Sequence, residues 1–317
     1  MKKLISISIP CFNEEENVEP MVEDLVRLFE KLRSKYDYKI QFIDNNSTDG
    51  TQQLLRRLCS KYPNVRAILN ARNFPLTSGY YGIIQAGGDC TISIPADFQV
   101  PLDTIPKMIE EWEKGAKIVC LVKKTSEETR WMWRIRQFYY KIANKFSDTT
   151  LTSNFTGSGL YDKTFLDLCR RINDPIVTFG QIISTLGYDI RIVEYSQLSR
   201  KKGKSKNNIY SLIELAFLRF TNASSIAPRL AAIAGVFIGL LSLLIGFIYF
   251  VLKLIFWYTF PAGVAPILIG VFFMGGIQLF FIGLLGEYVV KINIRLMNRP
   301  LVVEKERINF RSDGANS

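Results

Sequence analysis

Histidine is absent from this chain of 317 residues. That absence excludes serine–histidine and cysteine–histidine nucleophile systems, histidine zinc sites and any imidazole general base. Cysteine is scarce, and no Cys-x-x-Cys pair occurs, which argues against a thiolate zinc site or a secreted disulfide framework and predicts reduced, buried thiols. The cysteines are Cys11, Cys59, Cys90, Cys120 and Cys169. Any catalysis must therefore use carboxylates, amides, hydroxyls or cations.

Acidic residues are fewer than basic ones, with 29 Asp and Glu against 40 Lys and Arg, and the formal net charge is +11. The excess lies in residues 123–145, with seven basic and two acidic side chains, and in residues 200–229, with seven basic and one acidic. A basic patch can bind nucleic acid, anionic lipid or a phosphorylated ligand. We expect no nucleic-acid partner, because no RNA- or DNA-reading motif occurs.

Charged residues are missing from two long runs, residues 230–252 and residues 254–286. Crossing the hydrocarbon core of a bilayer takes about 20 apolar residues. The runs predict a two-helix transmembrane hairpin within residues 229–290, with helices at about 230–252 and 264–286 and an aromatic turn between them. Buried helices of a soluble protein are the alternative.

The cations that flank these runs predict an orientation. The basic segment 200–229 precedes the first span and further cations follow the second, whereas the connecting turn has only Lys253. By the positive-inside rule, both ends of the hairpin face the cytoplasm. We therefore expect a cytoplasmic domain at residues 1–225 and a cytoplasmic tail at residues 291–317.

The first 125 residues alternate short β-rich runs with helical patterns, which predicts a doubly wound α/β sheet. Strands are expected at 4–9, 40–44, 65–69, 91–94 and 118–122, and helices at 18–34, 51–59, 77–86 and 102–114. Ligands of such sheets bind beyond the carboxyl ends of the strands. Polar clusters that begin near Asn13, Asp44 and Asp97 fall at those ends.

Two further segments, about 129–147 and 207–225, have apolar residues at three- and four-residue steps with cations between them. A core-facing helix is the usual interpretation of such a pattern. Aromatic side chains alternate with the cations, and a predicted span follows the second segment directly. A juxtamembrane helix in the bilayer interface is therefore equally favoured.

The polar turns can bind a nucleotide. Residues 8–16 join a strand to a helix through a turn that can hold a base and ribose, although Asn13 is equally a helix N-cap. Asp44, at the end of a strand, can accept from a base N–H or a ribose hydroxyl. We interpret Asp44 as facing a ligand and residues 47–50 as mainly structural.

Several segments resemble one enzyme family when they are taken together. They are Ile-Pro-Cys-Phe-Asn-Glu-Glu-Glu-Asn at 9–17, Asp-Asn-Asn-Ser-Thr-Asp-Gly-Thr at 44–51, Ala-Arg-Asn-Phe at 71–74, Ala-Asp-Phe-Gln at 96–99, Arg-Lys-Lys-Gly-Lys-Ser-Lys at 200–206, Gly-Glu-Tyr at 286–288 and Arg-Pro at 299–300. This order resembles the family 2 GT-A glycosyltransferases over about residues 4–305. Within that family it is similar to the polyisoprenyl-phosphate branch, which includes dolichol-phosphate-mannose-synthase-like and bactoprenol-glucosyltransferase-like enzymes.

The resemblance implies an activity and a location. It implies a GT-A, Rossmann-like domain that transfers one hexose, with inversion, from a nucleotide sugar such as UDP-glucose to a polyprenyl phosphate such as undecaprenyl phosphate. The product would serve cell-envelope glycosylation. The enzyme would be a multi-pass protein of the bacterial inner membrane, and relatives suggest a homotetramer.

The resemblance also implies site residues. The donor would be bound by Pro10, Glu14, Asp44, Arg72 and Asp97, and the acceptor phosphate by Arg200, Lys204, Ser205 and Lys206. Asp97 would be the catalytic residue and, with Gln99, would hold Mg²⁺ or Mn²⁺. For residues 200–206, a solvated basic loop that attracts lipid is the alternative.

Two positions depart from the family pattern. Pro95 replaces the first carboxylate of the usual Asp-x-Asp metal motif, so less negative charge is present. A metal site remains feasible, because Mg²⁺ can use one or two carboxylates with substrate phosphates and water. No acid lies between Asp148 and Asp162, where relatives commonly carry one. Gly157 and Gly159 can instead let the backbone approach the donor sugar.

The missing histidine bears on the acceptor. A sugar hydroxyl needs a base during attack, whereas a polyprenyl phosphate is already an anion at neutral pH. We therefore favour the lipid phosphate. The alternatives are transfer to a carbohydrate hydroxyl and a degenerate relative that binds nucleotide sugar or scaffolds a membrane complex.

Overall fold

The structure is a computed structural model. It describes residues 2–125, 155–172, 179–198 and 264–310, with individual positions between 235 and 256. The predicted juxtamembrane helices at 129–147 and 207–225 and the acceptor segment 200–206 lie outside the described residues.

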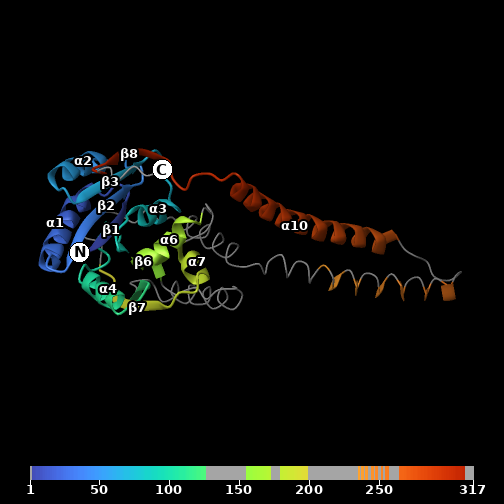
Figure 1. Ribbon diagram of the computed structural model, residues 1–317. Helices are drawn as coiled ribbons and strands as arrows, with labels where there is room; N and C mark the ends of the chain where they lie inside the picture. Colours follow the sequence, from blue (N-terminus) through green and yellow to red (C-terminus); the bar gives the residue numbers. More distant parts are fainter. Residues whose placement is uncertain are drawn as a thin grey trace.

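The centre of the sheet consists of four parallel strands in the order β3-β2-β1-β4. Figure 1 shows β3, β2 and β1 side by side. They are β1 (Lys3–Cys11), β2 (Tyr36–Asp44), β3 (Val65–Asn70) and β4 (Cys90–Ser93). The helices that follow these strands are α1 (Glu15–Leu32), α2 (Thr51–Lys61), α3 (Ser78–Gln85) and α4 (Thr104–Glu113). The predicted strand–helix alternation is therefore confirmed over this part of the chain.

The flanks of the sheet contain antiparallel strands, which the doubly wound prediction does not include. On one side, β6 (Phe155–Asp162) lies antiparallel between β4 and β5 (Ile118–Thr125), and β7 (Ile190–Ser196) pairs parallel with β5. On the other side, β8 (Glu304–Ile308) pairs antiparallel with β3. The result is an eight-stranded mixed sheet of order β7-β5-β6-β4-β1-β2-β3-β8.

Helices cover both faces of the sheet, so the fold has three layers (Figure 1). Apolar residues of α1, α2 and α4 share one core with strand residues such as Val119. Residues of α3, α6 (Lys163–Arg170) and α7 (Phe179–Thr185) share a second core with Ile118 and Cys120. This separation follows from the alternation of side chains along a strand.

All five cysteines are free and buried, which confirms the prediction from their spacing. Burial raises the pKa of the Cys59 thiol to about 12. Thiols in this state are inert, because the thiolate is the nucleophilic form.

One helix in the described part of the chain is long and apolar enough to cross a bilayer. Helix α10 (Val264–Leu296) contains this stretch at Phe273–Leu296, with a mean hydropathy of 1.6. Helix α10 begins where the second predicted span begins, but it ends at Leu296 rather than at residue 286. The predicted span stopped before the first charged residue, Glu287, but a charged residue does not end a helix. Asn298, at a φ of 45°, adopts the left-handed conformation common just after helices.

The structure describes only part of the first predicted span, 230–252. Its described positions are helical, and Ile238 lines a small apolar pocket with residues of α10 that include Phe273 and Phe280. The two-helix hairpin stays a prediction, because only one candidate span is found among the described residues.

After α10 the chain returns to the sheet. Val302 is buried, and β8 then covers the free edge of β3 (Figure 1). The segment predicted as a cytoplasmic tail therefore contributes a strand to the sheet of the N-terminal domain.

Candidate functional site

The candidate site lies where the strand order reverses. β1 has β2 on one side and β4 on the other, and the carboxyl ends of these parallel strands lie at the same edge. Open α/β sheets bind ligands in the crevice at such a switch point. Pro10 lies near the end of β1, in register with Ile43, and Asp97 follows β4.

The turn after β1 is hydrogen-bonded to the turn after β2. Asn13, at a φ of 55°, donates its backbone N–H to Ser47 Oγ at 2.8 Å, and its side-chain Oδ1 accepts from the backbone N–H of Thr48 at 2.7 Å. Glu14 donates its backbone N–H to Thr51 Oγ1 at 3.0 Å and accepts from Asn17 Nδ2 at 2.6 Å. Asn13 is thus not the N-cap of α1, because its side chain joins the two turns.

Asp44 ends β2 and is fully buried. Its Oδ2 accepts from the backbone N–H of Ser47 at 3.0 Å and from Gln52 Nε2 at 2.8 Å, and the Ser47 hydroxyl donates to Oδ1. The carboxylate therefore holds the turn that receives Asn13. Its predicted contact with a nucleotide stays a prediction.

Asn45 positions the loop that carries Arg72, a role that the sequence analysis missed. Its Oδ1 accepts from the backbone N–H of Phe74 at 2.7 Å, and its Nδ2 donates to Asn73 Oδ1 at 2.6 Å. Arg72 is exposed, with its guanidinium carbon 4.6 Å from the centre of the Phe74 ring. The only sequence signal for this role is that Asn45 is an amide next to Asp44. An amide side chain can donate and accept hydrogen bonds at the same time, as Asn45 does here.

Asp97 lies in a strained, buried turn after β4. Its exposed fraction is 6%, and Oδ1 accepts from the backbone N–H of Gln99 at 3.2 Å. Phe98, between them, is buried and has a φ of 58°, which is unfavourable for a bulky side chain. Strain of this kind concentrates at functional sites, where surrounding contacts maintain it.

The turn at Asp97 also contacts the chain segment that follows β7 and leads to the predicted acceptor segment. The backbone N–H of Leu198 donates to the carbonyl oxygen of Gln99 at 3.1 Å. Leu198 is the last described residue before residues 200–206. The predicted metal turn and the end of this connection are thus in direct contact.

Among the described residues, no group of three or more Cys, Asp or Glu side chains could form a metal cage. The predicted metal residues are Asp97 and Gln99, which together offer oxygen donors and one negative charge. Such a set fits a divalent cation that takes most of its other ligands from substrate phosphates and water.

The two glycines of β6 have different roles. A Cβ on Gly159 would lie 2.3 Å from the carbonyl oxygen of Val119, so the close neighbour of Gly159 is strand β5. Gly157 has a φ of 95°, and no atom of the described residues lies within 4 Å of the place where a Cβ would be. That the backbone at Gly157 approaches the donor sugar therefore stays a prediction. At Gly159, close packing against β5 explains why the residue is a glycine.

Asp162, the first acid after these glycines, has structural partners. It accepts from Trp112 Nε1 at 2.8 Å, from Lys117 Nζ at 3.1 Å and from the backbone N–H of Thr164 at 2.9 Å, where it caps α6. Burial acts to raise the pKa of Asp162, but these hydrogen bonds outweigh it and the pKa lies below its ordinary value.

The chain is similar to known proteins. The profile described as "Glycosyl transferase family 2" matches residues 6–167. The SfII prophage-derived bactoprenol glucosyl transferase of Shigella flexneri is 32% identical over 305 residues, 95% of this chain and 97% of that protein. The prophage bactoprenol glucosyl transferase homolog of Escherichia coli K12 is 32% identical over 307 residues, 95% of this chain and 98% of that protein. One solved structure, mannosyl-3-phosphoglycerate synthase from Rubrobacter xylanophilus, has a TM-score of 0.47 at 16% identity, over 72% of this chain and 74% of that one.

Proposed function

This chain belongs to glycosyl transferase family 2, and on that premise we propose that it transfers one glucose from a nucleotide sugar to a polyprenyl phosphate. The Shigella flexneri and Escherichia coli relatives carry bactoprenol glucosyl transferase in their names and match nearly the whole chain, which supports the sugar and the lipid acceptor. A scaffold or a transferase to a carbohydrate hydroxyl is the less favoured function.

One observation carries this proposal beyond the relatives' names, and it is the hydrogen bond between the Leu198 N–H and the Gln99 carbonyl. Arg200 follows Leu198 by two residues, and two residues of extended chain span at most about 7 Å. This contact supports an arrangement in which acceptor-binding residues begin beside the turn of Asp97. A donor diphosphate and an acceptor phosphate would then meet at one place.

The donor side uses residues at the ends of the central strands. We propose that Pro10, Glu14 and Asp44 form the part of the site that receives the base and ribose. Arg72 is exposed on a loop that Asn45 holds, and a guanidinium is suited to bidentate contact with a diphosphate. Asp97 and Gln99 would hold Mg²⁺ or Mn²⁺, which would neutralise charge on the diphosphate leaving group when bound.

The transfer needs no proton acceptor. An anionic oxygen of the polyprenyl phosphate attacks the anomeric carbon of glucose from the face opposite the diphosphate. The bond from that carbon to the diphosphate oxygen breaks, and the nucleoside diphosphate leaves with the electron pair. The products are a polyprenyl phosphate sugar with inverted configuration and a nucleoside diphosphate.

The main task of the protein is to bring two anions together, because both substrates carry phosphates. We propose that Arg200, Lys204 and Lys206, with the Ser205 hydroxyl, bind the acceptor phosphate and offset this repulsion. Helix α10 would anchor the domain at the cytoplasmic face of a bacterial inner membrane, where such a lipid is available. Assembly into a homotetramer is part of the same proposal.

Membranes that contain the full chain test the function. They are given undecaprenyl phosphate with UDP-glucose, and in parallel with UDP-galactose or GDP-mannose, each labelled in the sugar. We expect an acid-labile labelled glycolipid with UDP-glucose. Binding of UDP-glucose by calorimetry without any glycolipid would contradict transferase activity and favour the binding-protein alternative.

A further inference from the structure

The loop that carries Arg72 is fastened at both ends to the chain segment that follows the membrane helix. At its start, the backbone N–H of Ala71 donates to the carbonyl oxygen of Val303 at 2.9 Å. At its end, Thr77 Oγ1 donates to the carbonyl oxygen of Leu301 at 2.6 Å. Residues 301–303 thus lie along the loop from Ala71 to Thr77.

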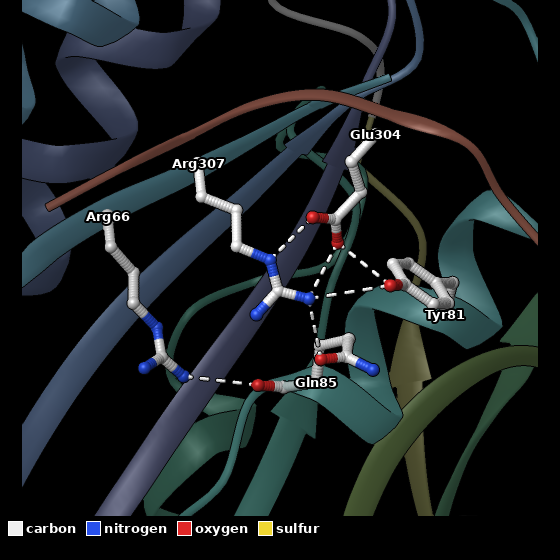
Figure 2. A network of polar contacts seen from close by, with 5 residues as sticks. All are labelled: Arg66, Tyr81, Gln85, Glu304 and Arg307. Carbon is white, nitrogen blue, oxygen red and sulfur yellow. Dashed lines mark hydrogen bonds and ion pairs between the residues drawn. The ribbon is translucent and has the colours of Figure 1, made fainter. Parts of the chain in front are cut away.

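Residues 301–304, which hold this loop, are themselves held by contacts to α3 and within β8 (Figure 2). Tyr81, on α3, donates its hydroxyl to Glu304 Oε1 at 2.8 Å. Arg307 Nη2 donates to Glu304 Oε1 at 2.7 Å and to Gln85 Oε1 at 2.9 Å. The position of residues 301–304 is therefore set by contacts on two elements.

Covering the edge of β3 does not explain all of these contacts. An exposed sheet edge can pair with a strand of another chain, and the backbone hydrogen bonds between β3 and β8 are sufficient to prevent this at β3. The hydrogen bond from the Thr77 side chain to Leu301 lies outside that ladder. This bond instead connects the end of the Arg72 loop to the chain that leaves α10.

We propose that Thr77 and residues 301–304 are positioning elements of the donor site, which hold the Arg72 loop in the form that binds the nucleotide sugar. This inference rests on the proposed function only in the identity of the donor. Asn45, which follows β2, bonds to the same loop, and β2 and β8 lie on the two sides of β3, the strand from which the loop begins. Donor affinity is in this way linked to the segment that follows α10.

A pair of substitutions at Thr77 tests the proposal in the full chain. Thr77→Val removes the hydroxyl and keeps the shape, whereas Thr77→Ser keeps the hydroxyl. Loss of one positioning hydrogen bond should raise the KM for UDP-glucose about three- to tenfold. We expect this rise for Thr77→Val and a near-wild-type KM for Thr77→Ser, with kcat and the KM for undecaprenyl phosphate within about twofold of wild type.

Arg56→Gln is the matched control. It breaks the ion pair to Glu306 on β8, at 2.7 Å, without touching the Arg72 loop. The proposal is overturned if Thr77→Val and Thr77→Ser behave alike, or if Arg56→Gln raises the donor KM as much as Thr77→Val. Calorimetric Kd values for UDP-glucose on the same variants give the same comparison without an acceptor, so a failure of lipid transfer is distinguished from a failure of this inference.

Discussion

The centre and the flanks of the sheet are built differently. The central strands β1 to β4 follow one another through consecutive helices, whereas β6 and β8 pair antiparallel with their neighbours and β8 follows α10 in the chain. The centre brings the predicted donor residues to one edge. The flanks connect that edge to the rest of the chain, through Leu198 on one side and Leu301 on the other. The predicted donor residues thus lie at the centre of the sheet, whereas the connections to the rest of the chain lie at its flanks.

The largest expected effect is on the central edge. Asp97→Ala should lower kcat for transfer at least about 100-fold, because it removes the carboxylate that the metal motif retains. The measurement is turnover of labelled UDP-glucose with undecaprenyl phosphate. Asp103→Ala, at an exposed Asp that pairs with Lys107, is the control and should keep wild-type turnover. Normal turnover in Asp97→Ala would remove Asp97 from the site.

The packing of the flank against the centre is tested by Gly159→Ala. The added Cβ would lie 2.3 Å from the Val119 carbonyl oxygen, and such overpacking costs about 1–3 kcal/mol. We expect a fall of several degrees in Tm by circular dichroism. In Gly79→Ala, on α3, the added Cβ meets no atom within 4 Å in the described part of the chain, and Tm should be unchanged or slightly raised. Equal Tm values for the two variants would contradict the close approach of β5 and β6.

A smaller effect concerns the pH dependence of the same flank. The pKa of Asp162 is lowered in the folded protein, so its ionised form stabilises the fold above the unfolded pKa of about 3.9, and this contribution is lost as the pH falls through the folded pKa. Between pH 6 and pH 3, Tm should therefore fall more steeply for wild type than for Asp162→Asn. Parallel curves would show that the carboxylate contributes no such stability.

The smallest effect is expected at the outer edge. The side chains of Arg56 and Glu306 are each 40% exposed, and an exposed ion pair contributes about 0–1 kcal/mol. Glu306→Gln should lower Tm by no more than about 2 °C, and added salt should reduce the difference. A much larger drop would mean that this pair, rather than the backbone ladder, holds β8 in place.

Local pattern was sufficient to predict the centre of the fold. Each central strand is a short apolar run followed by a polar turn, so the sequence places Asp44 and Asp97 at strand ends. β6 and β8 lack this pattern, because β6 carries Gly157 and Gly159 and β8 is largely charged. Their positions depend on partners far along the chain, which a local pattern does not contain.

The same limit applies to the site. Asn45 and Thr77 bond to partners that the fold brings near, the Phe74 N–H and the Leu301 carbonyl, and the local sequence identifies neither partner. For Asp44, the sequence pattern predicts a polar group at the end of a strand, but it does not predict the hydrogen-bond partners of that group. Burial and its bonds to Ser47 and Gln52 appear only in the structure.

We propose that the acceptor is a lipid phosphate, which needs no deprotonation, as the absence of histidine first suggested. The most direct test gives the full chain labelled UDP-glucose with equal amounts of undecaprenyl phosphate and undecaprenol. Attack by a phosphate oxygen predicts label only in an acid-labile glucosyl phosphate lipid and none on the free alcohol. Glucosylation of undecaprenol at a comparable rate, or of neither lipid, would contradict it.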